Sequence, residues 1–183
     1  MKKGKIIVYT GPMFSNKSTM LLSAFERAVI AKRSVLAFKP VVDNRFGDSV
    51  IKSRRYGEEE AVNISKVEEL KNYDADVYII DEFQFLTGDV TVIDELANRG
   101  KIFYIAGLDK TAEGKPFGTM PDLLAVADEV IKLTAVCKDC GEDACNSFYL
   151  GQKSQDVAIG NNEYIPLCRD CWFKRIKQKE TIT

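Results

Sequence analysis

One stretch near the start of the chain constrains the fold more than any other. It runs from Lys5 to Thr19 and reads KIIVYTGPMFSNKST. Residues 6–9 form a short apolar, β-branched run, which predicts a buried strand. Gly11 ends that run, and a helical pattern begins at Lys17, with Leu21, Phe25, Ala28 and Val29 expected on one apolar face. A strand, a glycine turn and a helix that opens on Lys-Ser is the layout of a phosphate-binding P-loop.

The chemistry of phosphate binding accounts for this layout. Backbone N–H groups of the loop and the positive end of the helix attract anionic oxygens. We expect Lys17 to reach the β- and γ-phosphates of ATP and the Ser18 hydroxyl to bind Mg²⁺. The predicted phosphate-binding residues are Gly11, Pro12, Met13, Phe14, Ser15, Asn16, Lys17, Ser18 and Thr19. The alternative is a plain strand–turn–helix unit in which Lys17 is solvated.

The loop departs from the usual pattern at one position. The pattern Gly-x-x-x-x-Gly-Lys-Ser/Thr has glycine where this chain has Asn16. Asparagine is the non-glycine residue that best tolerates a positive φ, so we expect the loop to form.

A second motif, which is acidic, supports the nucleotide-binding interpretation. The apolar run Val77–Ile80 is followed by Asp81 and Glu82, which is a Walker B pattern about 65 residues after the P-loop. Asp81 is expected to hold Mg²⁺. Glu82 is a spare carboxylate that could accept a proton from an attacking hydroxyl. The alternative is that both carboxylates only solvate the end of a strand.

The order of elements predicts an α/β fold with a doubly wound, mostly parallel P-loop sheet of the RecA-like kind. Ligands then bind at the carboxyl ends of the strands. Residues 44–60 are expected to be a loop or an irregular edge. Ser65 and Glu68 are expected to form a capping box for a short helix at 66–73. The other predicted strands are 35–38, 77–80, 102–106 and 130–133, and the other predicted helices are 89–99 and 120–128.

Composition excludes some classes of function. The net charge of −1 gives no electrostatic footprint for duplex nucleic acid, so no nucleic-acid partner is expected. No run of about 18 apolar residues suggests a membrane partner, and the start of the chain shows no cleavable apolar segment. We therefore expect a cytoplasmic protein. The chain has no histidine, so a general base or metal ligand must be of another type.

The last fifty residues differ in character from the rest. All 5 cysteines lie after residue 136, and four of them form two C-x-x-C knuckles at Cys137/Cys140 and Cys168/Cys171. Four thiolates in two such knuckles suit a structural, tetrahedral Zn²⁺. The alternatives are buried thiols or disulfides, and a cytoplasmic location disfavours the latter. We expect a P-loop domain at 1–134 and a small zinc-binding domain at 135–183, in which zinc closes the base of a long loop with β signals at 147–150 and 157–159. A basic helix is expected at the end of the chain.

The set of motifs resembles the type II thymidine kinases over nearly the whole chain. The matching motifs, in order, are GPMFS-x-KST at 11–19, FKP-x-x-D-x-R at 38–45, DE-x-QF at 81–85, GLD at 107–109, KPFG at 115–118, LTAVC-x-x-C at 133–140 and CR-x-C at 168–171.

This resemblance implies transfer of the ATP γ-phosphoryl group to the 5′-hydroxyl of thymidine, giving dTMP and ADP in nucleotide salvage for DNA synthesis. It implies Glu82 as catalytic base with Lys17 and Arg45 beside it, and Ser18, Asp81 and Asp43 around Mg²⁺. The zinc-anchored loop resembles the family's lasso, which grips thymine largely through main-chain groups. The implied nucleoside-binding residues are Met13, Gln84, Phe85, Leu108, Ala112, Phe117, Ser147, Asp156, Val157, Ala158, Ile159, Gly160 and Tyr164. Ala112 replaces a bulkier aromatic residue, so the pocket is expected to be roomier there. The family also implies a homotetramer and feedback inhibition by dTTP.

Two other classes of function stay open on the residues alone. One is a P-loop NTPase or switch protein with a zinc ribbon and no nucleoside acceptor. The other is a zinc-ribbon nucleic-acid binder without catalysis, which the near-neutral charge argues against.

Overall fold

The computed structural model describes residues 3–42, 50–53, 57–151 and 163–182. At its centre is a six-stranded sheet in which every neighbouring pair of strands is parallel. Parallel strands buried on both faces are expected to be apolar throughout, and Val77–Ile80 is buried at every position. In spatial order the strands are β5 (Val62–Ile64), β2 (Val35–Pro40), β6 (Val77–Ile80), β7 (Ile102–Gly107), β1 (Lys5–Thr10) and β8 (Glu129–Lys132).

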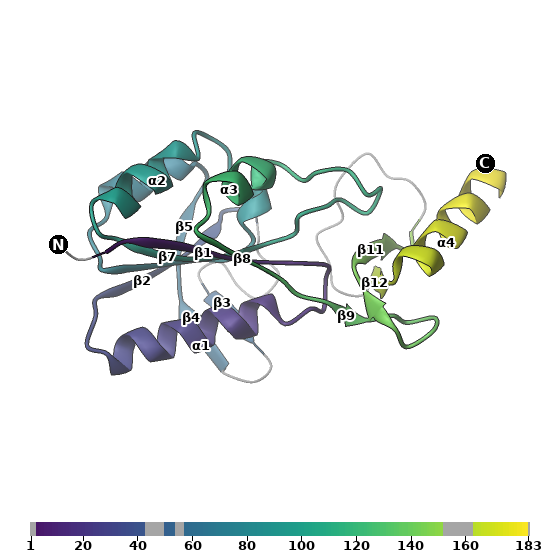
Figure 1. Cartoon of the computed structure of the whole chain (residues 1–183), viewed down its shortest axis with the longest axis horizontal. Helices are drawn as coiled ribbons and strands as arrows, with labels where there is room; N and C mark the ends of the chain where they lie inside the picture. The colour runs from purple at the N-terminus through teal and green to yellow at the C-terminus, as the bar shows by residue number, and fades with distance from the viewer. Residues whose placement is uncertain (1–2, 43–49, 54–56, 152–162, 183) are drawn as a thin grey trace.

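Helices cover both faces of this sheet, as a doubly wound fold requires (Figure 1). The helix α1 (Lys17–Ile30) lies on one face and packs against Ile7, Tyr9 and Ile79 in one core cluster. On the other face a second cluster includes residues of the 3₁₀ helix η1 (Val67–Asn72), α2 (Thr91–Asn98) and α3 (Met120–Val126). The predicted α/β fold with a mostly parallel sheet is therefore confirmed.

The buried face of α1 differs in part from the prediction. Leu21 and Ala28 are buried as expected, and Leu22 and Ala24 are buried with them. Phe25 is partly buried against the same cluster, whereas Val29 is 52% exposed. The apolar side chains of Val29 and Ile30 therefore stay on the surface of the described structure.

Two local predictions need correction. Part of the segment predicted as irregular forms an antiparallel hairpin of β3 (Val50–Ser53) and β4 (Gly57–Glu60). The segment 66–73 forms the 3₁₀ helix η1 rather than an α-helix. The backbone N–H groups of Ser65 and Lys66, just before this helix, donate to Glu69 Oε1 at 2.9 Å and not to Glu68. Glu68 instead accepts a bond from the backbone of Asp89.

The last part of the described chain has a small core of its own, built around Ala135, Phe148 and Leu167. It lies beyond the carboxyl ends of the sheet strands at one end of the molecule (Figure 1). Its elements are the paired strands β9 (Ala135–Val136) with β10 (Asp143–Ala144), the paired strands β11 (Asn146–Tyr149) with β12 (Tyr164–Leu167), and the helix α4 (Arg169–Ile182). Among the described residues, no helix combines the length and the apolar character needed to cross a membrane.

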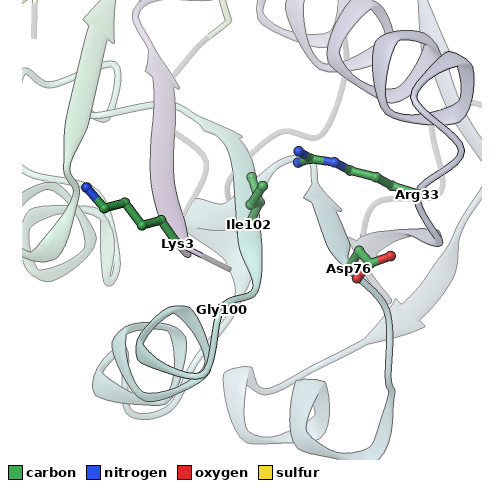
Figure 2. A pocket seen from close by; sticks show the side chains of 5 residues that line it. All are labelled: Lys3, Arg33, Asp76, Gly100 and Ile102. Atoms are coloured by element: carbon green, nitrogen blue, oxygen red, sulfur yellow. The ribbon is translucent and has the colours of Figure 1, made fainter. Parts of the chain in front are cut away.

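A pocket lies at the opposite edge of the sheet, where the strands begin (Figure 2). Its lining includes Arg33, which lies shortly before β2, and Asp76, which directly precedes β6. The carboxylate of Asp76 accepts bonds from the backbone and the hydroxyl of Ser34 at 3.2 Å, so it ties the starts of two adjacent strands together. This pocket is thus remote from the carboxyl edge, where the predicted site residues lie.

Candidate functional site

The predicted phosphate loop lies between β1 and α1, at the carboxyl edge of the sheet. Gly11 has φ +143°, and a Cβ there would lie 2.2 Å from the carbonyl oxygen of Leu133. No other residue fits that close approach without moving the backbone. The glycine that ends β1 is therefore required by packing as well as by the turn.

Asn16 takes the left-handed conformation expected of it, with φ 65° and ψ 26°. It is the N-cap of α1, and its carbonyl accepts the first helical bond, from the backbone N–H of Met20. Phe14 also has a positive φ, of 66°. Two non-glycine residues in this conformation within one short loop indicate a backbone shape that is held against its local preference. The prediction that asparagine allows the loop to form is confirmed.

Lys17 is buried, and its ammonium group lies within the loop. Its Nζ donates to the Pro12 carbonyl at 2.7 Å and contacts the Ser15 hydroxyl at 3.4 Å. Ser15 also donates to the same carbonyl at 2.8 Å. A desolvated cation at the helix start, where the helix dipole is also positive, makes a site for anionic oxygens. The alternative of a solvated Lys17 is therefore wrong.

Asp81 lies across from this loop at the end of β6. Its carboxylate is buried and accepts a hydrogen bond from the Ser18 hydroxyl. Burial raises the pKa of Asp81 to about 6, the negative charge of Glu82 adds to the rise, and the Ser18 bond opposes it. Carboxylate and hydroxyl oxygens are the ligands that Mg²⁺ prefers, so Ser18 and Asp81 fit a magnesium ion bound beside phosphates.

Glu82 follows directly and has a strained backbone, with φ 50° and ψ 40°. Its backbone N–H donates to Asp81 Oδ1 at 2.9 Å. Its carboxylate Oε2 accepts a bond from Gln84 Nε2 at 2.5 Å. A non-glycine residue in this conformation, directly after the buried carboxylate of Asp81, fits the general observation that backbone strain clusters at active sites.

The predicted nucleoside-side residues lie around the same edge. Phe85 and Phe117 make an edge-to-face contact with ring centroids 5.5 Å apart. Leu108 donates its backbone N–H to Gln84 at 2.9 Å. Ser147 accepts a bond from the backbone of Met13 at 3.0 Å. These contacts join Met13 to Ser147 and Gln84 to Leu108, each pair from segments far apart in the sequence.

Tyr164 and Ala112 are placed by the C-terminal segment. The ring of Tyr164 lies 5.1 Å from that of Tyr149 on the paired strand. The carbonyl of Ala112 accepts a bond from the indole N–H of Trp172 at 3.1 Å. The remaining predicted residues lie outside the described part of the chain; they are Asp43, Arg45, Asp156, Val157, Ala158, Ile159 and Gly160.

The structure shows contacts that the sequence interpretation missed. Trp172 comes directly after the last cysteine knuckle, and its position beside the 112–114 loop had no local signal. Lys110 donates to the Asn146 side chain at 2.6 Å, which is a second link between the sheet domain and β11. Lys39 is 1% exposed, and its Nζ contacts the Val50 carbonyl at 3.4 Å. A lysine at the end of an apolar strand was the available signal for that buried charge.

The four knuckle cysteines form one cluster. The Sγ atoms of Cys137, Cys140, Cys168 and Cys171 all lie within 4.8 Å of one another. Four sulfurs at the usual Zn–S distance of about 2.3 Å in a tetrahedron are about 3.8 Å apart. The Cys140–Cys168 distance is 3.7 Å, which fits that geometry and is far too long for a disulfide. The cluster can therefore hold a metal ion.

Local hydrogen bonds prepare one of these thiols for the anionic form. Burial pushes the pKa of Cys137 up, but hydrogen bonds from the backbone at Cys168, Asp139 and Cys140 outweigh burial and lower it to about 6. The thiolate is the form that binds a metal. Cys145 lies outside the cluster and keeps a neighbouring contact with the Asn146 amide at 3.4 Å.

A family model described as thymidine kinase matches residues 4–172. The chain belongs to the thymidine kinase family. Its phosphate loop, Asp81 and Glu82 are thus parts of a kinase, and ATP with Mg²⁺ is the phosphoryl donor that the family implies.

Individual members of the thymidine kinase family agree over the full fold. A protein named thymidine kinase from Porphyromonas gingivalis is 41% identical over 181 residues, which cover 95% of this chain and 87% of that protein. One of the same name from Bacteroides fragilis is 38% identical and covers 97% of this chain and 91% of the relative. Another from Pseudothermotoga lettingae is 36% identical, with coverage of 93% and 96%. The match to the family model, over residues 4–172, spans the phosphate loop and both groups of cysteines.

Proposed function

We propose that the chain is an ATP-dependent thymidine kinase that transfers the γ-phosphoryl group of ATP to the 5′-hydroxyl of thymidine. The observation that carries this proposal is a pair of adjacent carboxylates, Asp81 and Glu82, at the strand end facing the phosphate loop, in a chain of the thymidine kinase family. In a phosphoryl transfer to an alcohol, two carboxylates have separate roles: one binds the metal ion, and the other accepts the proton of the hydroxyl. A hydrolytic P-loop protein could use the same pair with water as the acceptor, so membership of the thymidine kinase family is what favours a nucleoside hydroxyl.

The reaction can be written on these residues. Glu82 accepts the proton of the 5′-hydroxyl as its oxygen attacks the γ-phosphorus, the bond from that phosphorus to the β-bridging oxygen breaks, and dTMP and ADP form. Lys17 holds the β- and γ-oxygens. Ser18 and Asp81 would bind Mg²⁺, which neutralises charge on the phosphates. We assign supporting roles at the phosphates to Asp43 and Arg45 by family resemblance.

The nucleoside is proposed to lie between the 108–118 loop and the C-terminal segment. Contacts of Ser147 with Met13 and of Trp172 with Ala112 support this location, since both join that segment to the catalytic edge. Phe85, Phe117 and Tyr164 supply aromatic surface for a base. The grip on thymine by the main chain of 156–160 is proposed from the resemblance.

We further propose that the four-cysteine cluster holds structural Zn²⁺ and that residues 135–183 form a separate domain. The separate core around Ala135, Phe148 and Leu167 supports the domain boundary. Four thiolates leave no open coordination position, so the ion would have no catalytic step.

Three wider properties are proposed from membership of the thymidine kinase family. Exposed Val29 and Ile30 on α1 support self-association, consistent with a homotetramer. Inhibition by dTTP would provide feedback on DNA precursor synthesis, because dTTP is built from the product. A cytoplasmic location suits nucleotide salvage and the reduced cysteines.

Product analysis tests the proposed reaction against its main alternative. The protein would be incubated with ATP and Mg²⁺ in parallel reactions that contain thymidine, deoxyuridine, deoxycytidine or no nucleoside. We expect ADP and dTMP in equal amounts with thymidine. ADP release at the same rate without any nucleoside would instead identify a P-loop NTPase.

A further inference from the structure

The side chain of Gln84 occupies a buried position between two strand ends. It lies in the short 3₁₀ turn η2 (Phe83–Phe85) that follows β6, and it is 3% exposed. Its amide bonds on one side to Glu82 and on the other to the backbone of Leu108, which follows β7. Both polar ends of the amide are therefore engaged within the protein, although the family resemblance places Gln84 among the nucleoside ligands.

The backbone fixes which way this amide points. The N–H of Leu108 is only a donor, so the group it meets at 2.9 Å must be the oxygen of the Gln84 amide. The NH₂ group then has to face Glu82 Oε2, which lies at 2.5 Å. The Glu82 oxygen accepts this bond, so the Gln84 amide donates at one end and accepts at the other.

Close packing leaves the Gln84 side chain little freedom. A Cβ at Gly107 would lie 3.0 Å from Gln84 Oε1, and one at Gly118 would lie 2.4 Å from the Gln84 carbonyl oxygen. Two glycines from the same 107–118 segment thus make room for this one residue. A rigid donor of this kind can hold a neighbouring carboxylate in one orientation.

The Glu82 carboxylate stands on a strained backbone and contacts the Gln84 amide. Glu82 is a non-glycine residue at φ 50°, a conformation that the surrounding structure must impose. Its neighbour Asp81 is oriented by Ser18 and by the Glu82 N–H. The Gln84 amide donates a side-chain hydrogen bond to the Glu82 carboxylate.

We propose that Gln84 is a positioning residue for the catalytic base, one that aims the Glu82 carboxylate at the acceptor hydroxyl and ties its orientation to the 107–118 segment on the nucleoside side. This inference rests on the proposed function, because it takes Glu82 as the base. The competing possibility is that Gln84 only satisfies the Leu108 N–H and holds the turn together.

Two substitutions separate these roles. Gln84→Glu keeps an acceptor for Leu108 but replaces the donor that faces Glu82 with a like charge. Gln84→Met has a similar length and removes both bonds. We expect kcat with thymidine to fall about 10- to 100-fold in each variant, the scale seen when a reacting group is misplaced, while KM for ATP changes less than about threefold.

A double-mutant cycle supplies the decisive measurement. The same two substitutions would be made in a Glu82→Gln background, where there is no base left to aim. We expect less than about twofold further loss of kcat there, because two residues that act as one unit are not additive. Thr119→Val is the matched control. The substitution removes the hydrogen bond that the Thr119 hydroxyl donates to the Leu86 carbonyl at 3.1 Å in the same region. We expect kcat to stay within about twofold of the parent.

The outcomes distinguish the inference from the proposed function. An equal loss of kcat from Gln84→Glu in both backgrounds would show a merely structural role and overturn the inference, as would wild-type kcat in Gln84→Glu. Wild-type kcat in Glu82→Gln alone would instead overturn the base assignment itself. If thermal denaturation shows that Gln84→Met does not fold, Gln84→Glu carries the test, since it keeps the bond to Leu108.

Discussion

The backbone N–H of Met13, in the phosphate loop, donates a hydrogen bond to the hydroxyl of Ser147 at 3.0 Å, across 134 positions of sequence. Met13 follows β1 of the central sheet, whereas Ser147 lies on β11, whose Phe148 packs in the same small core as Cys137. The loop that would hold ATP is therefore in direct contact with the segment that would hold the nucleoside.

Replacing Ser147 tests this link. Ser147→Ala leaves the Met13 N–H without its acceptor, and a typical net loss of about 1 kcal/mol corresponds to about fivefold in an affinity. We expect KM for thymidine to rise by about that factor, with a smaller change for ATP. Thr134→Val is the control, because Thr134 makes an exposed bond to Asp143 in the same segment. An unchanged KM for thymidine in Ser147→Ala would contradict the coupling.

The base assignment predicts a specific loss in Glu82→Gln. The amide keeps the size of the side chain but cannot accept the proton of the attacking hydroxyl. We expect kcat to fall about 100-fold or more while ATP binding stays nearly intact. Steady-state kinetics and an ATP titration measure the two effects separately. Near-normal turnover would mean that another group takes the proton.

The conformation of Asn16 predicts the effect of restoring glycine. At φ 65° asparagine is strained by about 1 kcal/mol relative to glycine. We expect Asn16→Gly to keep or improve KM for ATP, by at most about tenfold. ATP titrations of the two proteins at equal Mg²⁺ give the comparison. A clear loss of affinity would instead identify the Asn16 side chain as a phosphate ligand.

The cysteine cluster predicts about one Zn²⁺ per chain. Metal analysis of the purified protein measures it directly. Cys145→Ser should keep the metal, since Cys145 lies outside the cluster, whereas Cys168→Ser should lose it and raise KM for thymidine more than for ATP. Loss of zinc in the Cys145 variant would show that the ligand set is different.

The raised pKa of Asp81 predicts how its charge affects stability. Because burial and Glu82 raise this pKa to about 6, the folded protein binds a proton more tightly than the unfolded chain between about pH 4 and pH 6. The contribution of Asp81 to stability therefore falls as pH rises through that window and is smallest above it. Metal-free Asp81→Asn, which cannot ionise, should have a higher Tm than the parent at pH 7, by a larger margin than at pH 4.5. Equal margins at both pH values would contradict the assignment.

Local patterns in the sequence determined the order of elements. Apolar runs such as 77–80 predicted buried parallel strands, because a strand covered on both faces has no polar positions. Gly11, Asn16 and Lys17 predicted the phosphate loop from what each backbone or side chain allows. The spacing of the cysteines predicted the cluster. The strand signals, the phosphate-loop signals and each C-x-x-C knuckle act within a few residues of chain, so no long-range contact was needed to recognise them.

Where two turn geometries compete, the sequence pattern was not enough. The segment 66–73 has a helical composition, but it forms a 3₁₀ helix with Lys66 as its N-cap, one residue later than predicted, so the residue three positions on that reaches the free N–H groups is Glu69 and not Glu68. Likewise, the β3–β4 hairpin forms in a polar, charged segment whose strand pairing has no strong alternation to reveal it.

Only the tertiary structure decided the partners of the site residues. Gln84 meets Glu82 nearby in the chain, but it also meets Leu108 because parallel β6 and β7 end side by side. Met13 meets Ser147, and Trp172 meets Ala112, through contacts between segments that are far apart in sequence. Periodicity reports which side of an element is buried, whereas a hydrogen-bond partner depends on where the whole fold places a distant backbone.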